Sequence, residues 1–278
     1  MNRTLLLKQY SPTWLGQIIE CHPSVPSTND RARDILDQLG PAAHGAVVMA
    51  EEQTGGRGRH GRSWHSPRGL GLALSVALWN EGPSDRAVCL PLAGSLAVLR
   101  ALHHSAGLRG RLKWPNDVLV GGKKVSGVLV ESRVQGGRPS GLVLGIGVNL
   151  LHREEDFPED LRSFATSVRL AGGRPVTEEA FAASLLVALS PLIEEGLMNP
   201  AALVEKASGT WAHEPGDLLD VSSGEEILRG TFAGIAPDGS LLLKVDGRIQ
   251  AVHHGDVTRV RPGGPRAGIL AKEEKRGS

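Results

Sequence analysis

The sequence predicts an α+β domain followed by a small antiparallel β-barrel. Over residues 27–211, apolar runs with helical spacing alternate with shorter runs that suit buried strands. After Pro215 the pattern changes to short alternating runs separated by Ser-Gly and Asp-Gly pairs, which favour hairpin turns. From Pro262 onward, glycine, proline and lysine dominate, and such a composition cannot bury a core. We expect an extension at 1–22, domains at 23–213 and 214–262, and a disordered tail at 263–278.

The first half of the chain has clear start and stop signals. Cap-type residues Ser27-Thr28-Asn29-Asp30 precede a helical run, which Gly40-Pro41 ends. Two apolar runs, Ala46–Gln53 and Leu70–Trp79, read as buried strands. Residues 84–106 have helical spacing, with Pro91 near the first turns.

The second half continues with strands and then helices. Glycine pairs supply turns between three strand-like runs, Arg111–Trp114, Val125–Val134 and Gly141–Leu150. Val176–Leu197 reads as a second long helix that Thr177 opens, and Asn199–Trp211 as a last helical piece.

Composition narrows the class of protein. The 278 residues carry a formal net charge of +1, which excludes binding of nucleic acid by bulk charge. Cys21 and Cys89 have no metal-ligand spacing, so we expect reduced thiols in a cytoplasmic protein. Three consecutive leucines near the N-terminus are too few for a signal peptide, and we expect no apolar run long enough to cross a membrane.

Two pairs of adjacent histidines, His103-His104 and His253-His254, are the nearest approach to a metal motif. Adjacent histidines rarely ligate one ion together, and no carboxylate or cysteine completes either pair. We therefore expect no metal held by protein ligands alone.

The segment Gly55–Trp64, GGRGRHGRSW, places three arginines on a glycine-rich stretch. Its match to GxGxxG is not a dinucleotide turn, because the following Ser-Trp-His-Ser-Pro cannot continue a helix, and it lacks the Gly-Lys of a P-loop. Guanidinium groups form bidentate hydrogen bonds with phosphate or carboxylate oxygens. Two interpretations remain: a solvated basic loop, or an anion clamp that is disordered when empty and closes over its ligand.

Three further segments are weak signals when taken singly. They are Lys113–Asp117 (KWPND), Lys123–Gly127 (KKVSG) and Gly145–Leu150 (GIGVNL). A lysine beside an aspartate is usually a surface ion pair, and a lysine at the start of a strand is usually solvated.

Together and in this order, however, the segments resemble the biotin protein ligases (biotin–[acetyl-CoA-carboxylase] ligases). The resemblance rests on Ser27-Thr28-Asn29, Gln53, GRGRHGRSW, KWPND, Lys124-Val-Ser-Gly with GVLVE behind it, and GIGVN, and it spans residues 27 to about 150. It implies a class II synthetase-like mixed sheet with flanking helices. It also implies that the trailing barrel is SH3-like.

The resemblance implies a reaction in two steps. The carboxylate of biotin attacks the α-phosphate of ATP to give biotinyl-5′-AMP, and a lysine of a biotin carboxyl carrier domain then attacks that anhydride. Two anions repel, so arginines and a lysine are needed to stabilise the transition state, and Mg²⁺ assists on the phosphates. A loop that closes over the adenylate would protect it from water.

The resemblance also assigns roles to residues. Lys124 and Arg59 are assigned to catalysis, with Lys123 as the alternative to Lys124 because a slip of one residue exchanges the faces of a strand. Biotin binding falls to Ser27, Thr28, Asn29, Gln53, Arg57, Gly58, Lys124 and Gly127. Adenylate binding falls to Arg57, Arg59, Arg62, Trp64, Lys113 and Asn149, and Asp117 lies in the active site. Trp64 either packs against the adenine or fills the core.

Other functions are considered beside this one. A lipoate or octanoate ligase shares the fold and the chemistry, and a biotin sensor without turnover would keep the same polar residues. A nucleic-acid binding module is disfavoured, because aromatic residues make up only 4% of the chain. About 22 residues precede the biotin motif, too few for the three helices of a helix-turn-helix, so we expect no operator binding. A homodimer through the central sheet is among the states that the resemblance allows.

Overall fold

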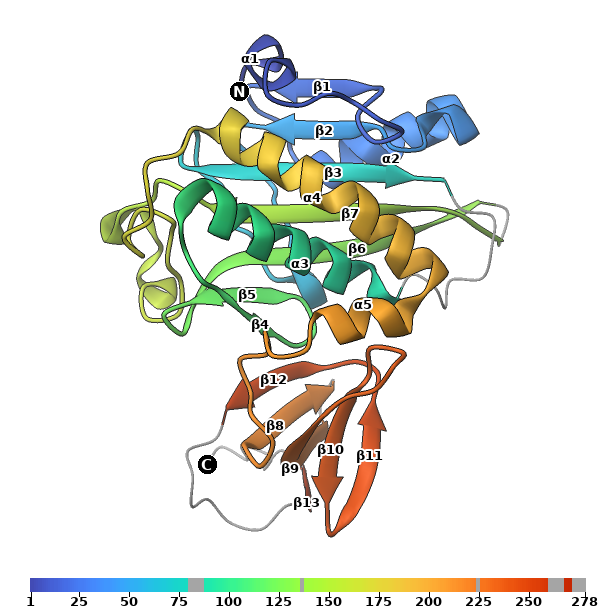
Figure 1. Cartoon of the computed structure of the whole chain (residues 1–278), viewed down its shortest axis with the longest axis vertical. Helices are drawn as coiled ribbons and strands as arrows, with labels where there is room; N and C mark the ends of the chain where they lie inside the picture. Colours follow the sequence, from blue (N-terminus) through green and yellow to red (C-terminus); the bar gives the residue numbers. More distant parts are fainter. Residues whose placement is uncertain (80–87, 136–137, 224–225, 260–267, 272–278) are drawn as a thin grey trace, which may run out of the picture.

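The computed structural model describes residues 1–79, 88–135, 138–223, 226–259 and 268–271. A seven-stranded mixed sheet with helices on both faces forms the larger unit, and an antiparallel sheet of C-terminal residues packs at one end of it (Figure 1). The prediction of an α+β domain followed by a small antiparallel unit is confirmed.

The central sheet has the strand order β1-β2-β3-β7-β6-β5-β4. The β1–β2 pair is parallel, and the other pairs are antiparallel. The strands are β1 (Ile19–His22), β2 (Val47–Ala50), β3 (Gly71–Leu78), β4 (Arg111–Lys113), β5 (Asp117–Val120), β6 (Lys123–Gln135) and β7 (Arg138–Asn149). Sequence analysis missed β1 and β5, each of which has a single buried residue, whereas all four residues of the equally short β2 are apolar and buried.

The segment 1–22 is part of the larger unit. It forms helix α1 (Arg3–Leu7) and strand β1, and its Leu6 and Leu15 are fully buried in the main core. It is therefore an edge of the central sheet, where a weakly patterned extension was expected.

Alternation along the strands gives the sheet two distinct faces. On one face, Val47 and Met49 belong to the main core with α3 (Leu90–Ala101), α4 (Glu178–Met198) and α5 (Pro200–Lys206). On the other face, Val48 packs in a smaller core with α2 (Thr28–Leu39). Figure 1 shows α3 and α4 across the front of the sheet and α2 behind it.

The helix boundaries follow the cap signals closely. Ser27 precedes α2, and Gly40, at φ +55°, ends it as predicted. Thr177 accepts a hydrogen bond from the N–H of Ala180 (3.2 Å) at the start of α4. Helix α3 begins at Leu90, because Pro91 is tolerated only in a first turn, and it continues as a π-helical turn to Ala106. The predicted start of this helix, at 84–87, lies outside the described residues.

Helix α4 corrects one expectation from the sequence. Among the described residues, α4 is the one helix that is both long enough and apolar enough to cross a membrane, judged by length and composition alone. Half of its apolar stretch is buried inside the protein, however, and Phe181, Leu185 and Leu189 are fully buried in the main core. Its apolar composition is therefore that of a core helix.

The C-terminal unit has the strand order β11-β10-β9-β8-β12, with β13 paired to β9. Its strands are β8 (Leu218–Ser223), β9 (Glu226–Ile235), β10 (Leu241–Val245), β11 (Arg248–Val252), β12 (Asp256–Arg259) and β13 (Gly268–Ala271). Strand β13 lies where a disordered tail was expected, and the rest of that tail beyond residue 271 is outside the described residues.

The two units are joined at the KWPND segment. Trp114 is buried in the core of the C-terminal unit, and its indole N–H donates to the carbonyl of Gly239 (2.9 Å). Just before this segment, the N–H of Leu112 donates to the carbonyl of Thr210 (2.7 Å), in the stretch of chain that leads into the C-terminal unit. This segment therefore fixes the C-terminal unit beside the edge of the sheet at β4.

The packing of α4 gives a direct prediction of stability. Phe181→Ala should lower the free energy of unfolding by about 3–5 kcal/mol, because it leaves a cavity in the main core. Val187→Ala on the same helix is the matched control, since Val187 is 61% exposed and should change the value by less than about 0.5 kcal/mol. Urea denaturation measures both, and equal effects would refute the burial of this face.

Candidate active site

A cleft of about 450 Å³ opens on the face of the sheet that carries α2. Strands β5, β6 and β7 form its floor, the loop 56–64 covers it, and Asp256 of the C-terminal unit closes one side. Every predicted site residue lines it: Ser27, Thr28, Asn29, Gln53, Arg57, Gly58, Arg59, Arg62, Trp64, Lys113, Asp117, Lys124, Gly127 and Asn149. Residues far apart in the sequence are thus brought together, and their roles remain predictions.

Glycines on β7 give the floor of the cleft its depth. A Cβ on Gly147 would lie 2.4 Å from Cε2 of Trp64, and a Cβ on Gly145 would lie 2.3 Å from Oδ1 of Asn29. No side chain fits in either place, so the Trp64 ring and the Asn29 amide lie directly on the sheet.

A β-bulge decides which lysine faces the cleft. Lys124 pairs with Leu119 and Ser126 pairs with Val118, so Val125 is the extra residue on β6. The bulge places Lys124 on the same face as Gly127, three positions later, where a regular strand would place them on opposite faces. Lys123 points elsewhere, and its Nζ donates to the carbonyl of Arg162 (3.0 Å).

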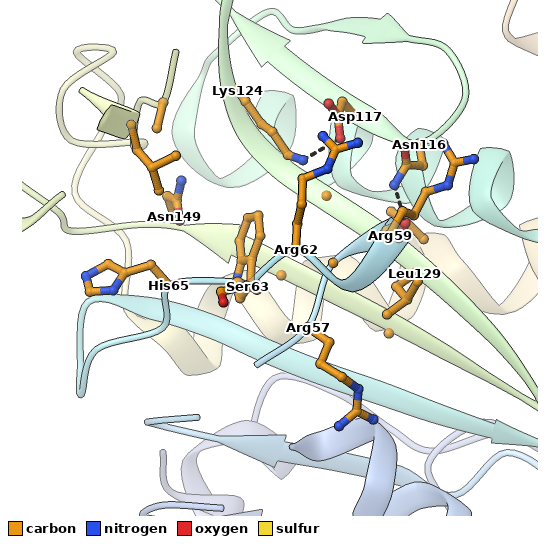
Figure 2. A pocket seen from close by; sticks show the side chains of 18 of the residues that line it. Arg57, Arg59, Arg62, Ser63, His65, Asn116, Asp117, Lys124, Leu129 and Asn149 are labelled. Carbon is orange, nitrogen blue, oxygen red and sulfur yellow. Dashed lines mark hydrogen bonds and ion pairs between the residues drawn. The ribbon is translucent and has the colours of Figure 1, made fainter. Parts of the chain in front are cut away.

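Lys124 is held by two neighbours. Its Nζ lies 2.6 Å from Oδ1 of Asp117 and 5.6 Å from the centroid of the Trp64 ring, a cation–π distance (Figure 2). Lys113 stands close by, and burial lowers the pKa of its ammonium group, although Asp117 opposes that shift. This part of the cleft therefore places two ammonium groups, those of Lys113 and Lys124, near the carboxylate of Asp117.

The arginine loop is a defined hairpin, where a disordered segment was expected. The N–H of Trp64 donates to the carbonyl of Gly56 (2.9 Å), and the N–H of Gly58 donates to the carbonyl of Arg62 (2.6 Å). Arg59–Gly61 forms a short 3₁₀ turn at the tip. We call residues 56–64 the arginine hairpin.

Carboxylates explain why the hairpin is ordered. Nη1 of Arg59 donates to the carbonyl of Gly255 (3.0 Å) and to Oδ1 of Asp256 (3.2 Å), and Arg62 forms an ion pair with the same Asp256. Burial lowers the pKa of Arg59, with Arg62 adding to the shift and Asp117 opposing it. The protein itself therefore supplies the anion that the arginines require.

At the N-terminus of α2, hydrogen bonds orient two amides. Oε1 of Gln53 accepts from the N–H (2.8 Å) and the hydroxyl (2.9 Å) of Thr28, which leaves the Gln53 NH₂ as the remaining donor of this amide. Nδ2 of Asn29 donates to Glu131 (2.6 Å), and its Oδ1 accepts from the hydroxyl of Ser75 (2.6 Å). Asn29 is therefore 5% exposed and has both amide atoms engaged by the protein.

Several lining or supporting residues were missed by sequence analysis. Asp256 and Ser75 belong to no motif, and Glu131, which ends the GVLVE segment, was given no role; only the folded chain brings the three to the site. Phe164 is 70% exposed and lines the cleft, and its backbone carbonyl accepts a hydrogen bond from the N–H of Lys124 (2.7 Å). An exposed aromatic in a polar loop was the signal that could have found Phe164.

Over the described ranges, no group of three or more histidine, cysteine or acidic side chains is placed to hold a metal ion. The donors around the cleft are mainly cationic, which suits an anionic ligand better than a bare cation.

Comparison with family models gives two matches. Residues 22–149 match the model described as the biotin/lipoate A/B protein ligase family. Residues 219–259 match the biotin protein ligase C terminal domain.

Curated relatives and solved structures give the same picture. The biotin–[acetyl-CoA-carboxylase] ligase of Paracoccus denitrificans is 33% identical over 74% of this chain and 88% of its own length. The bifunctional ligase/repressor BirA of Bacillus subtilis is 28% identical over 87% of this chain and 74% of its own length. The structure of a biotin protein ligase from Aquifex aeolicus in complex with biotin and ATP has a TM-score of 0.73 at 26% identity, covering 88% of this chain and 99% of that one.

The wall beside Phe157 gives a prediction of pH dependence. His152 is 1% exposed and stacks on Phe157 with a centroid distance of 4.7 Å. Burial, with a smaller contribution from His65, lowers the pKa of His152 to about 4, while Asp156 opposes the shift. In the unfolded chain, the His152 imidazole takes up a proton near its ordinary pKa of about 6.5. The contribution of the neutral His152 to the stability of the folded state is therefore complete above pH 6.5, and it is lost as the pH falls towards 4.

The free energy of unfolding should therefore fall by up to about 3 kcal/mol between pH 6.5 and 4 because of this side chain. Urea denaturation at several pH values, compared between the wild type and His152→Leu, measures it. The variant should show a shallower pH dependence over this window. An unchanged slope in the variant would contradict the assignment to His152.

Proposed function

Because the chain belongs to the biotin protein ligase family, we propose that its cleft carries out both the formation of biotinyl-5′-AMP and the transfer of biotin to a carrier lysine. The chain is a ligase of the biotin–[acetyl-CoA-carboxylase] type. The similar protein from Aquifex aeolicus was solved with biotin and ATP bound, and this supports biotin and ATP as the proposed substrates here. Each residue of the cleft is proposed to have its own role in these two steps. The observation that carries it is the convergence of Lys124, Arg59 and Arg62 on one side of the cleft.

The polar end of the cleft at α2 would hold the ureido ring of biotin. A ureido ring has one carbonyl oxygen and two N–H groups. It therefore needs a hydrogen-bond donor for the oxygen and an acceptor for each N–H, all in fixed places, and Ser27, Thr28 and Gln53 offer such groups. Asn29 supports this end from below, since its own amide is engaged by Ser75 and Glu131. Gly58 and Gly127 leave room for the body of the ligand.

The cationic end would hold the phosphates. Lys124, which lines the cleft beside Asp117, is proposed to neutralise both the biotin carboxylate and the α-phosphate during attack. Arg59, Arg62 and Lys113 would stabilise the charge on the transferring group, and Asn149 would hold the nucleotide. Trp64 would offer its ring to the adenylate from the floor of the cleft.

Mg²⁺ is proposed to enter with ATP, bound mainly to the phosphates of the nucleotide. The described part of the chain offers no cluster of acidic ligands, and Asp117 is already paired with Lys124. Magnesium commonly binds in this way, with substrate phosphates and water as most of its ligands.

In the second step the ε-amine of the acceptor lysine attacks the carbonyl carbon of the anhydride, and AMP leaves. The hairpin and Asp256 shield the site from water until the acceptor arrives. The family implies a biotin carboxyl carrier domain as the acceptor.

The domain bounds, the location in the cell, the absence of operator binding and the oligomeric state are predictions from the sequence. The catalytic domain is proposed to end near residue 213 and to include residues 1–22, which pack into its core, and the SH3-like domain is proposed at 214–262; the family matches at 22–149 and 219–259 support this division. Cytoplasmic location, absence of operator binding and a homodimer remain expectations from the sequence. DNA binding and sedimentation measurements would test the last two.

The substrate is tested by exchange of pyrophosphate into ATP, run with biotin, lipoate, octanoate or no acid. Exchange should depend on biotin. Exchange with lipoate or octanoate in its place would keep the chemistry and overturn the substrate. Binding of biotin without exchange would favour a sensor that has lost catalysis.

The role of Lys124 is tested in the same assay. Lys124→Ala should lower the rate of exchange by about 10²-fold or more, because a preorganised cation at the transferring phosphate is lost. Lys123→Ala is the matched control and should stay within about twofold of the wild type, since its ammonium group lies outside the cleft. A larger loss in Lys123→Ala than in Lys124→Ala would refute the assignment.

A further inference from the structure

The three arginines of the hairpin do not share one environment. Arg59 and Arg62, near its tip, contact Asp256 of the C-terminal unit. Arg57, at its base, contacts helix α2 instead. Figure 2 shows Arg62 beside Lys124 and Asp117, with Arg57 directed to the opposite end of the cleft.

Arg57 and Asp30 form a bidentate ion pair. Nη1 of Arg57 donates to Oδ2 of Asp30 (2.8 Å), and Nη2 donates to Oδ1 (2.6 Å). Glu131 lies 3.6 Å from the same Nη2. Parallel hydrogen bonds of this kind fix the plane of a guanidinium group as well as its position, so this group is held in one orientation.

The electrostatics of the pair agree with its geometry. The hydrogen bond from Arg57 is the main cause that lowers the pKa of Asp30, and the hydrogen bond to Asp30 raises the pKa of Arg57. Asp30 lies in the first turn of α2, where the helix dipole also favours a carboxylate. An incoming phosphate would have to displace a carboxylate that this site already stabilises.

The backbone around Arg57 shows what the ion pair holds in place. Arg57 and Ser63 form an antiparallel bridge between the two legs of the hairpin. The N–H of Gly55 donates to the carbonyl of Pro26 (2.8 Å), just before α2. The base of the hairpin is thus attached to the start of α2 by its backbone and by the Arg57 side chain.

We propose that Arg57 is a positioning residue, which Asp30 holds so that the base of the arginine hairpin stays fixed on α2 while the arginines at the tip bind phosphate. This rests on the proposed function, because it gives Arg57 a task in the ligase reaction other than contact with the adenylate. The tip can exchange Asp256 for a phosphate without the hairpin leaving the cleft. Weakening the base would let water reach the adenylate and release AMP without transfer.

The test compares Asp30→Asn, Arg57→Ala and the double variant with the wild-type protein. Release of AMP with biotin and MgATP, in the absence of acceptor, should rise by about fivefold in each single variant, the effect of one partly exposed ion pair. The KM for ATP in pyrophosphate exchange should stay within about twofold. The double variant should resemble the single variants, because both changes remove the same interaction.

Arg33→Ala is the matched control. Arg33 also contacts Asp30 (2.8 Å) and lies 3.4 Å from Glu131, but it belongs to α2 and does not line the cleft. This variant should release AMP at the wild-type rate. An equal rise in Arg33→Ala would mean that any loss of charge near α2 has the same effect, and would overturn the proposal.

One further outcome would also overturn it. If Arg57→Ala raises the KM for ATP more than about tenfold while Asp30→Asn changes nothing, Arg57 is a direct ligand of the nucleotide. That result leaves the ligase function intact. Failure of the wild-type protein to exchange pyrophosphate with biotin would instead overturn the proposed function itself, so the two failures are distinguishable.

Discussion

The site depends above all on the compensation of clustered positive charge by carboxylates of the protein. Lys124 is paired with Asp117, Arg59 and Arg62 with Asp256, and Arg57 with Asp30. Without these partners, four cations would repel one another in a partly buried cleft. With them, the cations are already oriented, and a phosphate that replaces a carboxylate meets a site that needs little rearrangement.

The carboxylates come from different parts of the fold, and this divides the site into a fixed part and an exchangeable part. Asp117 lies on β5 of the central sheet, and Asp30 lies on α2, which packs against that sheet. Asp256 lies on β12 of the C-terminal unit, which Trp114 docks through its hydrogen bond to Gly239. The C-terminal unit thereby takes part in the cleft, and its position decides whether the tip of the hairpin is held.

Much of the fold and the site could be predicted from the sequence, because they depend on local signals. Cap residues predicted α2 and α4, and runs of apolar residues predicted β3 and β7. The remainder depends on contacts between distant segments. Asp256 has no motif around it, and the bulge at Val125 leaves no mark on Lys-Lys-Val-Ser-Gly, so the choice between Lys123 and Lys124 needed the strand register. Disorder of the arginine hairpin was expected because its internal carboxylate partners could not be seen.

A crystal structure with a non-hydrolysable analogue of biotinyl-5′-AMP tests the central claim most directly. The account predicts that Arg59 and Arg62 leave Asp256 and contact the phosphate together with Lys124, while Arg57 stays on Asp30. If Arg59 and Arg62 remain on Asp256 and the phosphate contacts neither of them, the exchange of carboxylate for phosphate is wrong.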